Sequence, residues 1–307
     1  MIGIVVLTYI NWADTLKCVR SIFESEKKCS YHIYIVDNAS PVLPDEEMLL
    51  FFKDARITYI RNEVNRGYSA GNNVGIKYAI SDGCREILIA NNDIIFKEDS
   101  IFNMYNYLNQ NETVGIVGPK VFKPDGSIQA INMGVKTGVR EKYMYLMRKT
   151  VFAPFVKDFI SKFNVLDQDL TKPFEVHSVS GCCFMMSERC SRDLTPLDEG
   201  TFLYGEELII GIGMEKKGYK TVYLTESEII HAHGQSTKSI KAFSYICLVE
   251  SELYYFKKYI GASAIQLFPL YFIRFLEFVA FSIKSADFRK NIKRYISVST
   301  KRLFMKY

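Results

Sequence analysis

Two amides and a carboxylate follow directly on an apolar run in the first third of the chain. Residues 87–90 are Ile, Leu, Ile and Ala, and Asn91, Asn92 and Asp93 come next. Buried polar groups cost free energy unless they are paired, so a buried strand that ends in such residues indicates a site. Open α/β sheets bind ligands at the carboxyl ends of their strands. Because carboxylate oxygens suit Mg²⁺ or Mn²⁺, we expect Asp93 to hold one of these cations against a diphosphate.

Three more polar clusters follow predicted strands or open predicted helices. They are Thr8, Tyr9 and Asn11 after residues 2–7, Asp37 and Asn38 after 32–36, and Arg66, Gly67, Tyr68 and Asn73 in the glycine-rich stretch 65–75. Glycines let the backbone approach a ligand, and the helix that begins here could turn its N–H groups to a phosphate. The stretch matches neither a phosphate-binding loop nor a dinucleotide fingerprint, because its glycines are spaced by four. One such cluster could be ordinary turn chemistry, but four together indicate a binding site.

The second half supplies two carboxylates and two imidazoles. Glu206 and Glu207 begin a predicted helix over 206–217, and His231 and His233 end a predicted strand. Acidic residues in a first turn also favour the helix dipole, which is the alternative to catalysis. Alternation along a strand puts both imidazoles on one face, as a metal site requires. Hydrogen-bonded histidines without a metal are the alternative.

A parallel sheet is the element that would bring these clusters together. Apolar strands are predicted at 2–7, 32–36, 57–60 and 87–90, and helices at 14–24, 46–52 and 70–80 lie between them. Strands that alternate with helices predict a doubly wound α/β sheet, with the polar clusters at one edge.

The pattern is looser after residue 100. Strands are predicted at 114–117, 120–122, 221–224 and 229–231, and one apolar strand at 176–186 is interrupted by Gly181. The aromatic and basic stretch 142–172 is predicted to be a mobile loop or short helices over the active site.

The last segment combines an apolar helix with a basic tail. A helix is predicted over 242–259, and residues 264–283 are almost wholly apolar. About 20 apolar residues can span a membrane, but Pro269, Arg274 and Glu277 favour an interfacial helix with a polybasic tail that attracts anionic lipid. An ordinary C-terminal helix packed on the catalytic domain is the alternative.

Composition bounds the class of protein. The chain has 307 residues, 48% of them hydrophobic, and a net charge of +5, which is too modest to indicate nucleic acid. Its seven cysteines fit neither a zinc site nor a disulfide framework, so free thiols in a reducing cytoplasm are expected. No basic stretch precedes the strand at Ile2, so no signal peptide is expected.

In these residues the chain resembles a family 2 glycosyltransferase of GT-A fold, closest to rhamnosyltransferase-like members that build bacterial surface polysaccharides. The resemblance runs from about residue 2 to 236 and rests on motifs in a fixed order. These are residues 5–15, 35–40, 65–73, Asn91-Asn92-Asp93, Ser180-Gly181-Cys182-Cys183, Phe202-Leu203-Tyr204-Gly205-Glu206-Glu207 and residues 231–236.

The resemblance implies a role for each site residue. Asp37 would read the nucleotide base, Asp93 and His231 would hold the metal, and Glu207 would be the base that activates the acceptor. Glu206 and Tyr204 would bind the acceptor. The residues implied to bind the nucleotide sugar are Thr8, Tyr9, Asn11, Asp37, Asn38, Arg66, Gly67, Tyr68, Asn73, Asn91, Asn92 and Gly181.

Three positions depart from the family pattern. Asn91 stands where the metal motif usually begins with Asp, and Asn is a neutral, weaker ligand. Ile10 stands where related rhamnosyltransferases often carry Asn, and Ile209 where they often carry a further Asp.

The resemblance also implies the organisation and the partners. A GT-A domain with a mixed sheet would span 1–240, with a nucleotide-binding half (1–100) and an acceptor-binding half (101–240), followed by a helical, basic segment over 241–307. The reaction would be an inverting, metal-dependent transfer of a sugar, with rhamnose favoured, from a dTDP- or UDP-sugar to a glycan or polyprenyl-linked acceptor. The enzyme would lie on the inner face of the cytoplasmic membrane, with a homodimer possible. A UDP-hexose, UDP-galactofuranose or UDP-N-acetylhexosamine donor is the alternative, as is a non-catalytic homologue.

Overall fold

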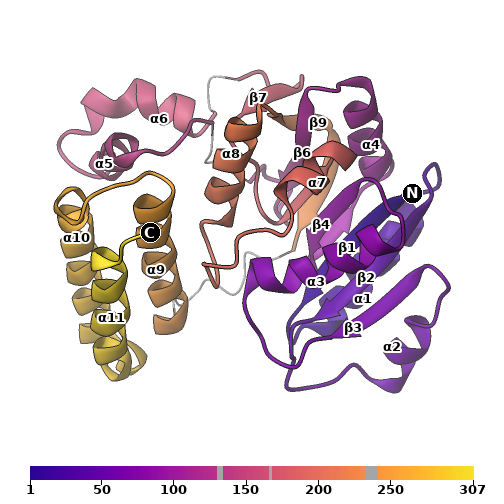
Figure 1. Ribbon diagram of the computed structural model, residues 1–307, viewed down its shortest axis with the longest axis horizontal. Helices are drawn as coiled ribbons and strands as arrows, with labels where there is room; N and C mark the ends of the chain where they lie inside the picture. Colours follow the sequence, from indigo (N-terminus) through magenta and orange to yellow (C-terminus); the bar gives the residue numbers. More distant parts are fainter. Residues whose placement is uncertain (130–133, 166–167, 233–240) are drawn as a thin grey trace.

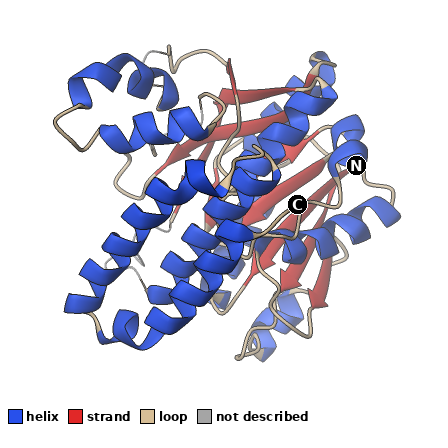
Figure 2. Cartoon of the chain, turned by 60° about the vertical axis from the view of Figure 1, so that its left-hand side comes forward, coloured by secondary structure: helices blue, strands red, loops and turns tan. Residues whose placement is uncertain are grey.

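The computed structural model describes residues 1–129, 134–165, 168–232 and 241–307. Within these residues, nine strands form one mixed sheet in the order β3-β2-β1-β4-β8-β6-β9-β5, with β7 beside β9 (Figures 1 and 2). The strands are β1 (Ile2–Thr8), β2 (Tyr31–Asp37), β3 (Ile57–Arg61), β4 (Ile87–Asn91), β5 (Ile94–Phe96), β6 (Val114–Phe122), β7 (Phe174–Val176), β8 (Cys183–Met186) and β9 (Lys220–His231).

The first half of the chain folds as predicted. Strands β1 to β4 are parallel, and the helices α1 (Trp12–Ser25), α2 (Glu46–Phe51) and α3 (Tyr68–Ser81) connect them. Alternate residues of each strand point to opposite faces of the sheet, so Ile4 and Val6 lie in one core while Val5 lies in the other. Both faces are therefore covered.

Different helices cover the two faces of the sheet. One core contains apolar residues of α1 and of α4 (Ser100–Gln110). The other contains residues of α3, of α7 (Glu188–Leu194) and of α8 (Glu206–Lys217). The polar strand ends lie at the edge between these layers.

The second half differs from the prediction in its strands. Residues 176–186 are not one strand, because β7 pairs with the edge of β9 while β8 lies between β4 and β6. The run is apolar because residues 176, 179 and 182–186 are buried, and burial alone does not distinguish a strand from a buried loop. Conversely, β6 and β9 are each one long strand where two short ones were predicted. The elements β5, α4 and α7 were not predicted.

The aromatic and basic stretch after residue 138 forms short helices. They are α5 (Val139–Met147), the 3₁₀ turn η1 (Ala153–Val156) and α6 (Lys157–Phe163). The Tyr143 hydroxyl donates to the Gln266 carbonyl oxygen at 2.7 Å, which holds α5 against the last part of the chain. Figure 1 shows α5 and α6 beside the start of α10.

Three helices end the chain. α9 (Ala242–Lys258), α10 (Ala264–Lys284) and α11 (Ala286–Phe304) pack together and against Ile209 and Ile212 of α8. Within the described residues, α10 is one helix whose length and composition would allow it to cross a membrane. One side of it rests on the protein, since Leu267, Leu270 and Phe278 are buried in this third core.

Candidate active site

The register of the parallel strands brings three predicted positions into one row. Thr8 lies opposite Asp37, Asp37 lies opposite Arg61, and Asn91 lies opposite Leu7. The carboxyl ends of β1, β2 and β4 therefore form one edge. The prediction that the polar clusters lie on the same edge is confirmed for these strands.

The Asp37 carboxylate is buried and held by three neighbours. It accepts the Ser40 backbone N–H at 2.8 Å and the Tyr59 hydroxyl at 3.3 Å, and its other partner is the Arg61 guanidinium at 3.5 Å. Arg61 is partly exposed, so it continues the polar surface from Asp37 towards solvent. Tyr59 and Arg61 were not singled out from the sequence, because they reach Asp37 only through the pairing of β2 with β3.

The loop after β1 presents Tyr9 and Asn11. Both are exposed, and the Ser40 hydroxyl accepts the Ile10 backbone N–H at 2.9 Å. Asn92 anchors the far end of the loop through its amide, which donates to the Asn11 carbonyl oxygen at 3.1 Å. Asn92 thus positions the loop, while Tyr9 offers a ring to a ligand.

Asn38 organises the glycine-rich stretch. Its amide donates to the Asn65 side chain at 2.9 Å and to the Gly67 carbonyl oxygen at 3.0 Å. Gly67 has φ +91°, and a Cβ there would lie 2.3 Å from the Phe202 carbonyl oxygen, so only glycine fits. The same carbonyl accepts the Tyr68 N–H at 2.9 Å. The first N–H of α3 is therefore already used, and a phosphate at the following N–H groups of this helix stays a prediction.

Arg66 and Asn73 lie against the segment before α8. The Arg66 guanidinium donates to Glu199 at 2.8 Å, and the Asn73 side chain exchanges hydrogen bonds with the Leu197 backbone. Asn73 thus links α3 to this segment. The role of Arg66 and Asn73 in binding a nucleotide sugar stays a prediction.

Asp93 and His231 meet because β5 pairs with β9. Ile94 lies opposite His231, and the two side chains face each other with 3.4 Å between Oδ1 and Nε2. His231 Nδ1 lies 3.0 Å from the Gln129 side-chain oxygen. If Nδ1 carries the proton donated to Gln129, Nε2 turns a lone pair towards the carboxylate. Gln129 was missed by sequence reasoning, because no pattern links it to residue 231.

This pair fits a divalent cation. The His231 imidazole and the Asp93 carboxylate are both ordinary metal ligands, and their facing atoms lie close enough to bind one cation. Among the described residues, no three His, Cys, Asp or Glu side chains gather as a metal site. His233, predicted to share the face of His231, lies outside the described residues.

Glu207 lies at the first turn of α8 and contacts Gly181. Its carboxylate accepts the Gly181 N–H at 3.2 Å, and the Gly181 carbonyl oxygen accepts the Tyr68 hydroxyl at 2.5 Å. Tyr204 and Gly205 have positive φ, which turns the chain sharply into the helix. Three predicted site residues, Tyr68, Gly181 and Glu207, are thus in direct contact.

The two acids at the start of α8 are both shifted towards the neutral form. Burial raises the pKa of Glu207. Burial, and then the charge of Glu207, raise the pKa of Glu206 well above its ordinary value. One Glu206 oxygen is buried with no hydrogen-bond partner among the described residues. Burial is therefore the main cause of both pKa shifts.

Cys182 connects the two halves of the site. Burial raises its pKa to about 12, and the charges of Asp93 and of Glu207 both contribute. Its carbonyl oxygen accepts the Asn91 N–H at 2.8 Å. The Gly181-Cys182 segment thus contacts Glu207 through Gly181 and contacts Asn91, two residues before Asp93, through Cys182. That Asp93 and Glu207 act in one site stays a prediction.

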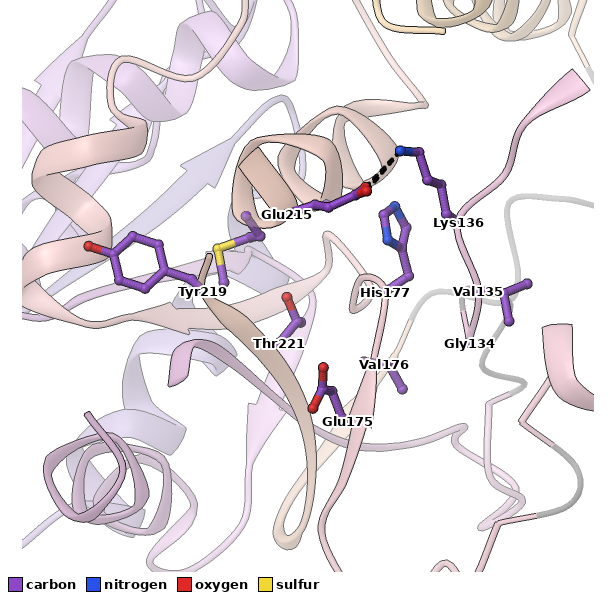
Figure 3. A pocket seen from close by; sticks show the side chains of 11 residues that line it. Gly134, Val135, Lys136, Glu175, Val176, His177, Glu215, Tyr219 and Thr221 are labelled. Atoms are coloured by element: carbon purple, nitrogen blue, oxygen red, sulfur yellow. Dashed lines mark hydrogen bonds and ion pairs between the residues drawn. The ribbon is translucent and has the colours of Figure 1, made fainter. Parts of the chain in front are cut away.

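A separate hollow of about 520 Å³ lies at the far end of α8. Figure 3 shows Lys136 reaching to Glu215 of α8 near the ring of His177, and the ion pair measures 2.8 Å. Burial lowers the pKa of His177, so this ring is neutral at pH 7. None of the predicted site residues lines this hollow.

The sequence profile described as Glycosyl transferase family 2 matches residues 3–195. The chain is 28% identical over 175 residues to the low-salt glycan biosynthesis hexosyltransferase Agl10 of Haloferax volcanii, covering 57% of this chain and 50% of the relative. It is 24% identical over 155 residues to an N-acetylglucosaminyl-diphospho-decaprenol L-rhamnosyltransferase of Mycobacterium tuberculosis, covering 49% and 48%. The chain thus spans about half the length of the curated relatives it matches.

Solved structures show the same architecture. GalNAc-T7 with UDP, GalNAc and Mn²⁺ has a TM-score of 0.56 at 15% identity, covering 76% of this chain and 43% of that one. TarS of S. aureus in complex with UDP-GlcNAc has a TM-score of 0.52 at 10% identity, covering 82% and 65%. At these identities the likeness concerns the fold.

Proposed function

The chain belongs to glycosyl transferase family 2 and has the predicted GT-A fold, and from this premise we propose that it is an inverting, metal-dependent sugar transferase. The donor would be a dTDP- or UDP-sugar, with rhamnose favoured, and the acceptor a hydroxyl of a glycan or polyprenyl-linked saccharide. One observation supports this most directly: the buried Glu207 accepts the Gly181 N–H, and the adjacent Cys182 carbonyl accepts the N–H of Asn91, which is two residues before Asp93.

Inversion by a single displacement needs a base on the acceptor side and charge neutralisation at the leaving group. Glu207 would take the proton of the attacking hydroxyl, and its raised pKa makes it a better base than a solvated glutamate. Glu206 and Tyr204 would orient the acceptor. Asp93 and His231 would hold Mg²⁺ or Mn²⁺, and an imidazole ligand favours Mn²⁺ because Mg²⁺ takes oxygen ligands. The bound cation would neutralise the departing diphosphate.

The donor end of the site would be formed by the row Thr8, Asp37 and Arg61 with the exposed ring of Tyr9. Asn91 would add a neutral oxygen near the metal. The activity would lie at the inner face of the cytoplasmic membrane, where a polyprenyl-linked acceptor is held. A UDP-hexose, UDP-galactofuranose or UDP-N-acetylhexosamine is the alternative donor.

The test is the variant Glu207→Gln, which keeps the shape of the side chain and removes the base. We expect transfer to fall by about 10²-fold or more while donor affinity changes little, because the base acts only in the transition state. Transfer is measured over a panel of dTDP- and UDP-sugars with and without Mn²⁺, and donor affinity by calorimetry.

Glu215→Gln, on the same helix but away from the site, is the matched control and should keep wild-type turnover. Wild-type turnover in Glu207→Gln would show that another group is the base. Nucleotide-sugar binding with no turnover for any donor would favour the non-catalytic homologue.

A further inference from the structure

The connection between α5 and α6 exposes an apolar tip. Val151 and Phe155 are 84% and 82% exposed, and Phe152 is also exposed. The tip has a defined shape, because η1 contains Pro154 and Val156 turns inward to anchor it. Burying such side chains away from water is favourable, so a cluster of them on a surface indicates an interaction site.

Basic residues bracket this tip. Lys149 and Lys157 stand at its two ends, and both are exposed. Arg148 lies over the Tyr145 ring, 3.5 Å from the ring centroid, one turn before the tip. Residues 148–158 contain these three cations and one acid, Asp158. Apolar side chains ringed by cations are complementary to the acyl boundary and the headgroups of an anionic bilayer.

A second apolar face lies on α10. Its exposed members follow the helical repeat and are Ile265, Phe268, Phe272, Leu276 and Ile283. At the end of this face, Lys284 is exposed and the Arg289 guanidinium donates to the Ser282 and Ile283 carbonyl oxygens. The face thus also ends in cations.

The opposite side of α10 packs against the rest of the protein. Arg274 donates to Glu252 of α9 at 2.9 Å and to Glu277 at 2.8 Å, and its side chain is only 13% exposed. A helix with a buried ion pair on one side and apolar residues on the other can lie on a bilayer, whereas crossing it would expose that pair to lipid.

The tip and the helix face belong to one edge of the molecule. Tyr143 of α5 contacts both the Gln266 carbonyl and the Leu270 N–H at the start of α10. Figures 1 and 2 both show the α5–α6 connection on the side of the molecule that α10 occupies. We propose that the tip 149–157 and the exposed face of α10 form one surface that docks on an anionic lipid bilayer.

Charge favours a bilayer over a second copy of the chain. Residues 241–307 contain twelve Lys and Arg against four Asp and Glu. A two-fold contact places the same patch on both subunits, so the cations Lys149, Lys157 and Lys284 would face a patch that carries the same positive charges. Anionic headgroups neutralise them instead. The proposal extends the lipid-linked acceptor proposed above, but vesicle binding is measured without turnover, so the two can fail separately.

The experiment measures flotation of the full chain with vesicles of phosphatidylglycerol and phosphatidylcholine, and with pure phosphatidylcholine. We expect binding to the anionic vesicles that weakens with salt. The tip variant Val151→Ser/Phe152→Ser/Phe155→Ser should bind at least about tenfold more weakly. The matched control Val42→Ser/Leu43→Ser/Leu50→Ser removes three exposed apolar residues in and before α2 and should bind like the wild type.

Insertion is tested directly with a tryptophan at the tip. Brominated lipid should quench the emission of Phe155→Trp and leave that of Leu50→Trp unchanged. Equal binding of the tip and control variants, or no quenching of Phe155→Trp, would overturn the proposal. The proposal would also be overturned if the wild type bound no lipid but formed a dimer that the tip variant abolishes. The surface would then pair two copies of the chain. Circular dichroism confirms that each variant is folded.

Discussion

At the scale of single residues, the backbone is strained at Ile10, one of the positions that the resemblance singled out. Ile10 has φ +73° and an exposed side chain. A β-branched residue rarely adopts this left-handed conformation, whereas Asn tolerates it well. The Asn often found here in related rhamnosyltransferases would therefore suit the backbone, and the chain keeps a strained turn beside Tyr9 and Ser40.

We predict that Ile10→Asn raises the free energy of unfolding by about 1 kcal/mol, because it relieves this strain and loses little packing. Urea unfolding of the variant and the wild type measures the difference. Leu43→Asn, also exposed, is the control and should change stability by less than about 0.5 kcal/mol. A destabilised Ile10→Asn would show that the Ile10 side chain makes contacts that matter.

The pH dependence of the reaction follows from Glu207. Burial raises its pKa above the ordinary value of 4.5, and a base must be deprotonated to act. Turnover should therefore be full above the raised pKa and fall as the pH drops through it, so the acid limb lies above pH 4.5. A pH profile at saturating donor measures this. A profile flat down to pH 4.5 would contradict the assignment.

At the scale of elements, Asp198 fastens α9 to the segment that leads into α8. It accepts the hydroxyls of Tyr254 and Tyr259 and the ammonium of Lys258. Burial alone would raise its pKa, but the hydrogen bonds from Lys258, Tyr259 and Tyr254 lower it to about 2. This carboxylate therefore links the C-terminal helices to the catalytic helix.

Asp198→Asn should lower the free energy of unfolding at pH 7 by about 1–3 kcal/mol, because charged hydrogen bonds are lost. A lowered folded pKa gives stability that is present above the unfolded pKa near 3.8 and disappears as the pH falls towards 2. The gap between variant and wild type should therefore close between about pH 4 and pH 2. Thermal unfolding over that range measures it, with exposed Asp14→Asn as control. A gap independent of pH would contradict the role given to this charge.

At the scale of the whole molecule, the last three helices complete the catalytic domain. Ile209 and Ile212 of α8 are buried in the core that α9, α10 and α11 share. Ile209 stands where relatives often carry Asp, and here an acid would lie in an apolar interface. Residues 241–307 therefore pack on α8 through an apolar interface, and the domain boundary at residue 240 stays a prediction.

Ile209→Asp should destabilise the protein by about 3 kcal/mol or more, since it buries an unpaired charge and removes apolar packing. Urea unfolding measures this, and Ile209→Val is the control, with a cost of about 1 kcal/mol. Deletion of residues 241–307 should give an aggregating protein for the same reason. A soluble, cooperatively folding 1–240 fragment would show instead that the segment is an independent unit.

Local patterns were enough to predict the parallel half of the sheet and to indicate candidate site residues. Alternating apolar strands and helices are local patterns, and polar residues at strand ends are visible without coordinates. Of the residues indicated in this way, the structure pairs Asp93 with His231 and Glu207 with Gly181, and their common role in one active site stays a prediction.

The arrangement of these residues depends on contacts between segments that are far apart in the sequence. Whether residues 176–186 were one strand or two depended on partners far along the chain, and so did the contacts of Gln129, Arg61 and Gly181. Pairing and burial between distant segments leave no periodicity in the sequence, because each partner satisfies only its own local pattern. Likewise, only the helices that pack against α10 show which of its sides is buried and which is exposed.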